Sequence, residues 1–144
     1  MELNICHLYP DLLNVYGDVG NILILKHRAE LRGIKVNILN NSLNDAFDVD
    51  NYDIVLFGGG QDFEQSIVSN DLSGAKKDAL EKYIEAGKVL IAICGGYQLF
   101  GQYYIAANNE KISGLQFYDY YTDTGKAGSR CIGNVVIDAN LDGL

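Results

Sequence analysis

The sequence predicts an α/β protein built on a doubly wound, mostly parallel sheet that is flanked by helices. Short apolar runs alternate along the chain with segments of helical periodicity, which favours parallel strands joined by right-handed crossovers. Two glycine-rich turns, at residues 58–60 and directly after Cys94, follow apolar runs and therefore lie at the carboxyl ends of predicted strands. Ligands bind at that edge of the sheet in such folds.

Three of the predicted strands lie in the first half of the chain. The elements expected there are a strand over residues 2–8, a helix over 19–31, a strand over 35–39, a polar loop or short distorted element over 40–51 and a strand over 52–57. Pro10 ends the first strand, because proline cannot continue a hydrogen-bond ladder. Asp18 is a suitable N-cap for the helix, and Gly33 is its stop signal.

The second half contains the Cys94 turn and a run of shorter elements. The elements expected there are helices over 62–69 and 72–86, a strand that begins at Val89, a helix after Cys94 and short strands over 103–106, 114–121 and 131–137. Gly87 ends the longer helix. The chain closes on a polar turn without a covering helix, so we expect a domain that is truncated at its C-terminal side.

Composition restricts the function. The chain has 144 residues, of which 48% are hydrophobic and 21% charged, enough for one globular domain with its own core. A formal net charge of −8 argues against nucleic acid or an anionic membrane as partner. No apolar stretch is long enough for a membrane span, so we expect a cytoplasmic protein. The three cysteines lack CxxC spacing and there are only two histidines, which argues against a disulfide framework and a metal site.

Cys94 lies where a buried strand is expected to turn sharply into a helix. A continuous apolar run, residues 89–93, precedes it, and two glycines follow it before the pattern becomes helical. A nucleophile on such a turn stands out from the sheet edge, and its strained backbone needs small neighbours. The start of the next helix favours the thiolate, the reactive form of cysteine. The pattern predicts a catalytic Cys94 on a central strand that is covered on both faces.

The alternative interpretation is that a cysteine only fills the core, as free cysteines often do. This interpretation suits Cys6 in the first strand and Cys131 at the start of an apolar run. At Cys94 the glycine pair and the change of periodicity favour a nucleophile. Ala92 stands two residues earlier, where such a turn usually has glycine, but alanine is also small.

The glycine run at residues 58–60 is the second candidate feature. If the strands before this run and before Cys94 are neighbours, the backbone N–H groups of Gly60 and Gly95 can point at one oxygen atom. Such a pair is an oxyanion hole for acyl transfer. A phosphate loop is the alternative, but the run lacks the GxxxxGK[ST] pattern. A dinucleotide fingerprint does not follow the first strand.

Three segments match motifs of a known family: residues 9–21 (YPDLLNVYGDVGN), 57–65 (FGGGQDFEQ) and 93–98 (ICGGYQ). In this order they resemble the class I, triad-type glutamine amidotransferases of the cobyric acid synthase-like branch. Within that branch, the chain is most similar to glutaminase subunits that pair with a Mur-ligase-like, MurT-type subunit. The resemblance implies a flavodoxin-like fold, with residues 1–144 as the N-terminal part of one glutamine amidotransferase domain.

The same resemblance implies a reaction. Cys94 would attack the side-chain amide of glutamine, a glutamyl thioester would form, and ammonia would leave. The ammonia would pass to the Mur-ligase-like partner, which would hold ATP and Mg²⁺ and amidate D-glutamate of a peptidoglycan precursor, lipid II. This chain itself would need no cofactor. Tyr97 and Gln98 would line the glutamine pocket, and Gly60 and Gly95 would donate to the oxyanion.

Two further residues match the family's motifs less specifically. Arg130 corresponds to an arginine that the family uses near bound glutamine, and its planar guanidinium suits the α-carboxylate of that substrate. A solvated turn residue is the alternative for Arg130. For Asp18 we prefer helix capping to a role near the active site or the partner.

One expected residue is missing. The family uses a histidine downstream of the cysteine as general base and acid, and no histidine follows Cys94. His7 ends the first strand and is the one candidate at the carboxyl edge, whereas His27 lies within a helix. We therefore expect a truncated chain that is inactive alone, because acid–base catalysis is typically worth about 10²–10⁴ in rate. A degenerate amidotransferase kept as a scaffold is the other interpretation.

Three other functions stay open. A cobyrinic or cobyric acid amidating domain shares both glycine turns, but it usually follows an ATP-binding domain in the same chain, and this chain starts directly at its first strand. A redox or chaperone-like protein of the DJ-1 type also carries a cysteine on such a turn, but the loop at residues 58–65 is not expected there. A non-catalytic binding module would bind glutamine without forming a thioester.

Overall fold

The computed structural model describes residues 1–15, 18–123 and 133–138. Strands and helices alternate through most of this part, as the sequence predicts. In chain order the elements are β1 (Glu2–Leu8), α1 (Asp18–Glu30), β2 (Lys35–Asn41), the 3₁₀ turn η1 (Val49–Asn51), β3 (Ile54–Phe57), α2 (Asp62–Asp71), α3 (Ala75–Glu85), β4 (Val89–Ala92), α4 (Gly95–Phe100), β5 (Tyr103–Ile105) and β6 (Lys111–Ser113).

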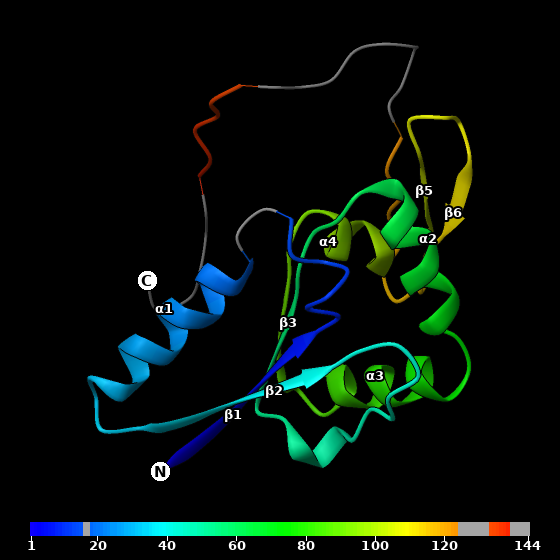
Figure 1. The fold of residues 1–144 in the computed structure, drawn as a ribbon. Coiled ribbons are helices and arrows are strands. Elements are labelled where there is room, and N and C mark those ends of the chain that lie inside the picture. Colours follow the sequence, from blue (N-terminus) through cyan, green and yellow to red (C-terminus); the bar gives the residue numbers. More distant parts are fainter. Residues whose placement is uncertain (16–17, 124–132, 139–144) are drawn as a thin grey trace.

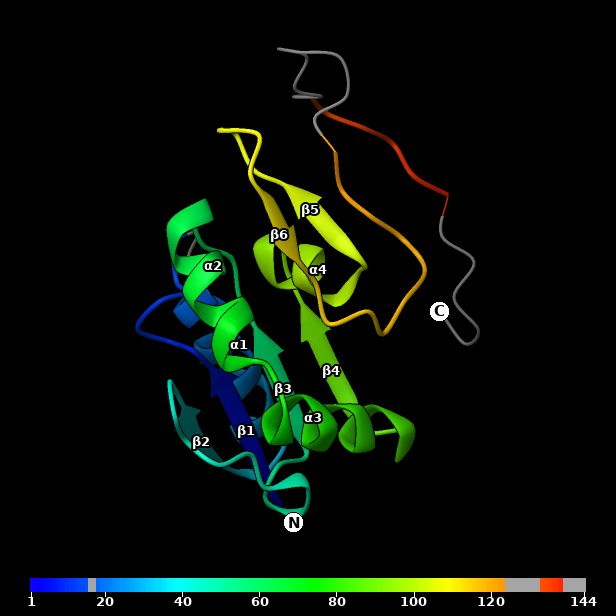
Figure 2. The same ribbon diagram turned by 90° about the vertical axis from the view of Figure 1, so that its right-hand side faces the viewer.

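The first four strands form one parallel sheet in the order β2-β1-β3-β4 (Figures 1 and 2). β1 is inside this sheet, because Cys6 pairs with Leu39 of β2 on one side and with Val55 of β3 on the other. The chain moves outward from β1 to β2 and then returns to the opposite side of β1. This is the doubly wound, flavodoxin-like order, with its switch point between β1 and β3. The predicted fold class is confirmed.

Helices cover both faces of the sheet, with α1 and α3 on opposite sides in Figure 1. On the α1 face the buried cluster is small and consists of Ile5, Ile22, Val36 and Leu56. On the other face lies the main core, which includes Cys6, Leu8, Phe57, Leu80 and Tyr83. Successive residues of β1 therefore enter opposite clusters, as the two-residue period of a strand requires.

In the part of the chain that the structure describes, the strand before Cys94 is not the central, covered strand that the sequence predicts. Within the described residues, β4 pairs only with β3 and forms an edge of the sheet. Leu90 and Ala92 pack against the main core, but Val89 is 52% exposed. An apolar run predicts a strand, but which strands lie beside it depends on segments elsewhere in the chain.

Most boundaries in the first hundred residues are close to those predicted. Gly33 and Gly87 have φ values of 72° and 70°, so both stop signals are confirmed at positions where the backbone is left-handed. The second helix of the predicted pair begins at Ala75 instead of residue 72. The break falls at Gly74, whose φ of 57° is incompatible with a continuous helix.

The prediction for the chain after Gly101 is only partly correct. β5 and β6 form a short antiparallel hairpin, but residues 114–121 contain no strand. The N–H groups of Leu115, Gln116 and Phe117 instead donate to the carbonyls of residues 99–101 at the end of α4. Those carbonyls have no partner within the helix, and the segment satisfies them. Of the strand expected over 131–137, residues 133–137 are not in a strand, and 131 and 132 lie outside the described residues.

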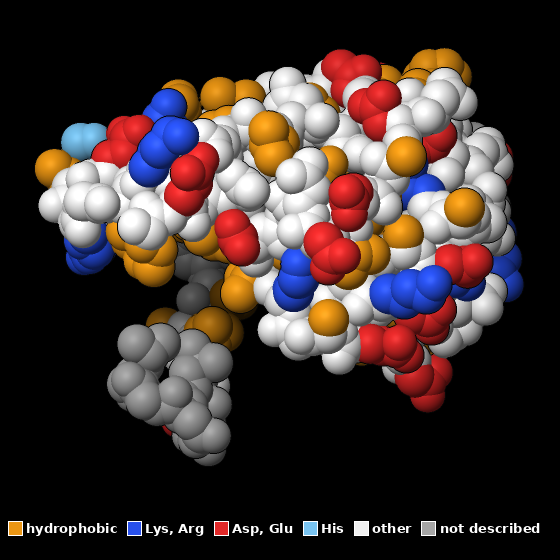
Figure 3. Space-filling model, turned by 90° about the horizontal axis from the view of Figure 1, so that it is seen from below, with side chains coloured by type: hydrophobic (Ala, Val, Ile, Leu, Met, Phe, Trp, Pro, Cys, Tyr) orange, Lys and Arg blue, Asp and Glu red, His pale blue; other side chains and the backbone are white. Residues whose placement is uncertain are grey.

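The surface carries both kinds of charge. On the face shown in Figure 3, acidic and basic side chains are interspersed with apolar ones. Among the described helices, none combines the length and the apolar character needed to cross a membrane.

Candidate active site

The sharp turn predicted at Cys94 joins β4 to α4. Cys94 has φ 53° and ψ −113°, a conformation that costs a residue with a side chain about 1–3 kcal/mol. Its side chain is exposed, whereas Gly95 and Gly96 are buried. A Cβ atom at Gly96 would lie 2.5 Å from the carbonyl oxygen of Phe57. The turn therefore packs against the end of β3 in a way that only glycine permits.

The glycine loop after β3 contacts this turn. The N–H of Gly96 donates to the carbonyl of Gly58 over 3.0 Å. A Cβ atom built on Gly59 would lie 3.5 Å from Cys94 Sγ. The pairing of β3 with β4 thus brings the loop at residues 58–60 beside Cys94, as the sequence predicts.

Cys94 borders a cavity of about 570 Å³ at the carboxyl edge of the sheet. Figure 2 shows α2, α4 and the β5–β6 hairpin gathered beyond the ends of β3 and β4. The lining residues are Gly60, Gln61, Asp62, Phe63, Glu64, Gln65, Cys94, Gln98, Tyr104, Ile105, Ala107, Thr122 and Asp123. This is the edge at which ligands bind in open α/β sheets.

Carboxylates dominate the charged lining of this cavity. They come from Asp62, Glu64 and Asp123, and no lysine or arginine is among the described residues that line it. Asp62 accepts hydrogen bonds from the Tyr104 hydroxyl at 2.6 Å and from the Ala107 amide at 2.9 Å. Burial, together with the bond to Asp62, raises the pKa of Tyr104, so the phenol keeps its proton and donates. The lining suits a ligand that carries an ammonium group.

The two predicted oxyanion donors, Gly60 and Gly95, are brought to Cys94 from different parts of the chain. Gly60 lines the cavity, and Gly95 is the residue after Cys94. Within the described ranges, neither N–H donates to a protein acceptor. The Gly60 N–H belongs to a trans peptide whose carbonyl, that of Gly59, accepts from the Val15 N–H at 3.2 Å. It therefore points away from Val15.

The two residues expected to line a glutamine pocket are separated by the structure. Gln98 is half-buried and lines the cavity with Cys94. Tyr97 is not among the lining residues; its ring is 52% exposed and stacks on Tyr120, with the ring centroids 4.5 Å apart. The hydroxyl of Tyr120 also donates to the Tyr97 carbonyl. Tyr97 thus contacts the segment that follows β6 and does not line the cavity.

The remaining candidates lie away from the cavity or outside the described residues. Arg130 and Cys131 fall in the latter group. Cys6 is fully buried, which raises the pKa of its thiol to about 12 and fits the predicted core role. His7 is buried as well and does not line the cavity. Burial lowers the pKa of His7 although Asp18 opposes the shift, so the imidazole is neutral at pH 7.

The prediction that Asp18 caps α1 is wrong. Asp18 lies within α1 and is 1% exposed, and the N–H of Val19 is instead accepted by the side-chain oxygen of Asn14 at 3.0 Å. The Asp18 carboxylate turns toward the glycine loop and accepts the Gly59 N–H at 3.3 Å. A Cβ at Gly58 would lie 2.6 Å from Asp18 Cγ. Asp18 therefore supports the loop beside Cys94.

Gln65 also lines the cavity, although the sequence predicted no role for it. Its side chain is 2% exposed and donates to the carbonyl of Gly60 at 3.0 Å. One pattern indicates its burial. Gln65 precedes the buried Val68 by three residues and Leu72 by seven, so it lies on the apolar face of α2.

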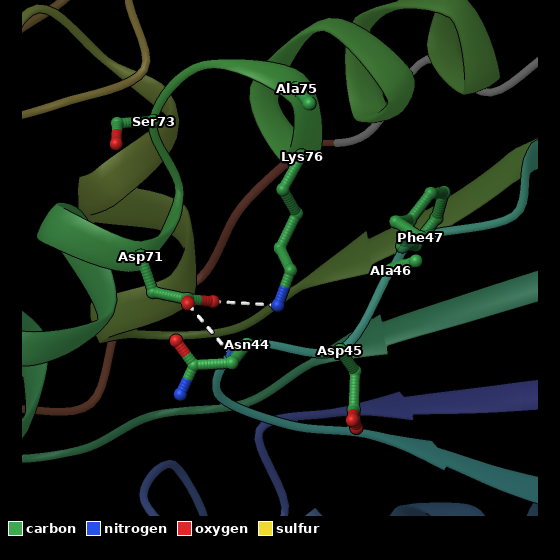
Figure 4. Close-up of a pocket in the computed structure, with 8 residues that line it drawn as sticks. All are labelled: Asn44, Asp45, Ala46, Phe47, Asp71, Ser73, Ala75 and Lys76. Carbon is green, nitrogen blue, oxygen red and sulfur yellow. Dashed lines mark hydrogen bonds and ion pairs between the residues drawn. The ribbon is translucent and has the colours of Figure 1, made fainter.

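A second cavity, of about 350 Å³, lies where the β2 end meets the α2–α3 turn (Figure 4). The buried Lys76 ammonium donates to the Asp71 carboxylate at 2.6 Å and to the Ser42 carbonyl at 2.7 Å. Asp71 also accepts from the Tyr9 hydroxyl at 2.6 Å and the Asn44 amide at 2.9 Å. The Lys76 ammonium and the Asp71 carboxylate thus find their hydrogen-bond partners within the protein, so we interpret them as a structural ion pair. Among the described residues, no group of three or more histidine, cysteine or acidic side chains is placed to hold a metal ion.

Replacing Lys76 with methionine should lower the free energy of unfolding by about 3 kcal/mol, because it leaves the carboxylate of Asp71 buried without its cation. Burial alone would raise the pKa of Asp71, but the hydrogen bonds from Lys76 and Tyr9 outweigh it and lower that pKa. The pair therefore stabilises the fold above about pH 4, and this contribution is lost as the pH falls through the lowered pKa.

Denaturant titrations at pH 7 and pH 3 measure both effects. Lys76→Met should lose less stability on acidification than the wild type. Lys82→Met is the control, since Lys82 is exposed on the same helix and its loss should change stability by less than about 0.5 kcal/mol. Equal losses of stability in the two variants would contradict a structural role of the Lys76–Asp71 ion pair.

Comparisons with known proteins agree with the geometry. Residues 4–143 match the CobB/CobQ-like glutamine amidotransferase domain. Two curated relatives are both named lipid II isoglutaminyl synthase (glutamine-hydrolyzing) subunit GatD. The Streptococcus pneumoniae protein is 51% identical over 136 residues, which are 94% of this chain and 52% of that protein. The Staphylococcus aureus protein is 39% identical over 142 residues, which are 99% of this chain and 57% of that protein. The chain thus spans about half the length of these curated relatives.

The fold is also found among solved structures. One example is the crystal structure of a protein assigned as peptidase E from Listeria monocytogenes EGD-e, with a TM-score of 0.53 and 16% sequence identity. The similarity covers 81% of this chain and 63% of that one, and it concerns the fold alone. The family follows from the domain match and from the two relatives: the chain belongs to the CobB/CobQ-like glutamine amidotransferase domains.

Proposed function

We propose that this chain is the glutaminase part of a two-subunit amidotransferase that acts on a peptidoglycan precursor. The observation that carries the proposal is the exposed Cys94 on its strained turn, beside a glycine loop and at the border of the large cavity. The identity of 51% to a subunit named as glutamine-hydrolyzing supports glutamine as the substrate.

The reaction begins when the Cys94 thiolate attacks the side-chain carbonyl carbon of glutamine. The S–C bond forms, and the carbonyl oxygen becomes an oxyanion that accepts hydrogen bonds from the N–H groups of Gly60 and Gly95. The C–N bond then breaks, the nitrogen takes up a proton, and ammonia leaves behind a glutamyl thioester. Water hydrolyses the thioester to glutamate and restores the thiol.

The cavity offers groups for the polar ends of glutamine. The carboxylates of the lining attract the α-ammonium group, and Gln98 provides an amide beside Cys94. Arg130 is our candidate for binding the α-carboxylate, through the paired N–H groups of its guanidinium.

The ammonia is consumed by a Mur-ligase-like partner of the MurT type, which binds ATP and Mg²⁺ and amidates D-glutamate of lipid II. The names of the two relatives, which are subunits of lipid II isoglutaminyl synthase, support this acceptor.

Labelling with a diazo-ketone analogue of glutamine tests the proposal. In the complete gene product, peptide mass mapping should find the label on Cys94 alone. Cys6 should stay unmodified, because it is buried and its thiol keeps its proton at neutral pH. Ammonia release from glutamine, with and without a Mur-ligase-like partner, is the second measurement. Faster labelling of Cys6 or Cys131, or an absence of ammonia release, would contradict the proposal.

A further inference from the structure

We infer that Gln65 is a positioning residue for glutamine hydrolysis, since its one buried side chain contacts the backbones of both proposed oxyanion donors, Gly60 and Gly95. The inference rests on the proposed function. It assigns to α2 a part in the reaction beyond lining the cavity.

Gln65 bridges two segments that are far apart in the sequence. Its Nε2 donates to the Gly60 carbonyl at 3.0 Å, at the end of the glycine loop. On the other side it packs directly against the start of α4: a Cβ atom at Gly95 would lie 2.7 Å from Gln65 Cδ and would overlap Nε2. The side chain therefore sets the separation between the two donors.

The hydrogen bond from Gln65 to the Gly60 carbonyl matters because Gly60 has no side chain to restrict its backbone. Each peptide plane that flanks Gly60 is held by one bond from outside the loop. The Val15 N–H holds the plane before it through the Gly59 carbonyl, and Gln65 holds the plane after it through the Gly60 carbonyl. Without Gln65 the second plane can rotate, and Gly60 then loses one of the two bonds that fix its position beside Cys94.

Gln65 also orients the neighbouring amide of the cavity. Its Nε2 lies 3.4 Å from Gln98 Oε1, a longer and weaker contact than the one to Gly60. One end of the Gln65 amide faces both the Gly60 carbonyl and Gln98. Because a carbonyl oxygen can only accept a hydrogen bond, that end of the amide is the nitrogen, Nε2. Gln98 then keeps its own Nε2 as the end that can donate to a ligand.

A packing role alone does not explain a glutamine at this position. The Oε1 atom of Gln65 is buried and has no hydrogen-bond partner among the described residues, which lowers stability. An apolar side chain of similar shape would fill the same space without burying an unpaired oxygen. The amide is therefore explained by what its nitrogen holds in place.

Gln65→Met tests the inference in the complete gene product assembled with its partner ligase. Methionine keeps the length of the side chain but removes the donor. We expect kcat for ammonia release to fall about 10- to 100-fold while KM for glutamine changes less than about threefold, because misplaced oxyanion donors act on the transition state. Gln102→Met is the control: Gln102 also donates to a carbonyl, that of Tyr118, but it does not line the cavity. It should keep wild-type kcat.

Gln65→Glu gives an independent readout. A carboxylate repels the Gly60 carbonyl, whereas a protonated carboxyl can donate to it. The ratio of kcat in this variant to kcat in the wild type should therefore rise as the pH falls, which loss of packing does not predict. Wild-type kcat in Gln65→Met, or a ratio that does not depend on pH in Gln65→Glu, would overturn the inference alone. A wild-type complex that releases no ammonia would overturn the proposed function and the inference with it.

Discussion

Cys94→Ala should abolish glutamine hydrolysis, with kcat lowered by about 10⁴-fold or more, because the nucleophile that forms the thioester is lost. Stability should barely change, since the Cys94 side chain is exposed and alanine keeps the strained backbone. Ammonia release by the complete gene product with its partner measures the first effect, and denaturant titration measures the second.

Cys94→Gly should be equally inactive but more stable than Cys94→Ala by about 1 kcal/mol. Glycine adopts a φ of 53° without a Cβ penalty, and this gain exceeds the entropy that glycine adds to the unfolded chain. A Cys94→Gly variant that loses activity but gains stability would show that the backbone at Cys94 is strained and that this strained conformation holds the nucleophile. A glycine variant less stable than the alanine variant would refute the strained turn.

Gly96→Ala should lower the free energy of unfolding by about 3 kcal/mol or more and reduce activity with it. A Cβ at Gly96 would lie 2.5 Å from the Phe57 carbonyl oxygen and 2.7 Å from that of Gly58. Both atoms belong to the backbone at the end of β3, so relief requires the turn to move away from the glycine loop. Such a movement also displaces Cys94.

Gly20→Ala is the matched control for this prediction. Gly20 lies in α1, and a Cβ there would meet no atom within 4 Å. Alanine should therefore stabilise the helix by about 0.5 kcal/mol. Denaturant titrations of the two variants should give changes of opposite sign. A Gly96→Ala protein as stable as the wild type would show that the turn at Cys94 and the glycine loop do not pack as described.

The order of the elements could be predicted well because it depends on local patterns. Apolar runs that end near a proline or a glycine located β1, β3 and β4, and helical periodicity located α1 and α3. The hairpin region was predicted less well. Residues 114–121 have strand-like composition, but their N–H groups satisfy the end of α4, a partner that no local pattern reveals.

The candidate site could be predicted in part for the same reason. Cys94 and the loop at residues 58–60 each follow a strand directly, and adjacent parallel strands must bring such turns together. The place of Tyr97 was not predictable, because its side chain stacks on Tyr120, a residue 23 positions away in the sequence.

The sequence by itself determined the fold class, the turn at Cys94 and the glycine loop, since all of them follow from periodicity and from residues adjacent in the chain. Only the tertiary structure decided which polar side chains turn inward. The sequence suits Asp18 to a helix start and places Gln65 on the apolar face of a helix, but it does not reveal that both side chains are buried against the glycine loop. The physical reason is that a polar side chain can be buried where it finds a hydrogen-bond partner. Asp18 finds one 41 residues away in the Gly59 N–H, and Gln65 finds the Gly60 carbonyl and, 33 residues away, the side chain of Gln98.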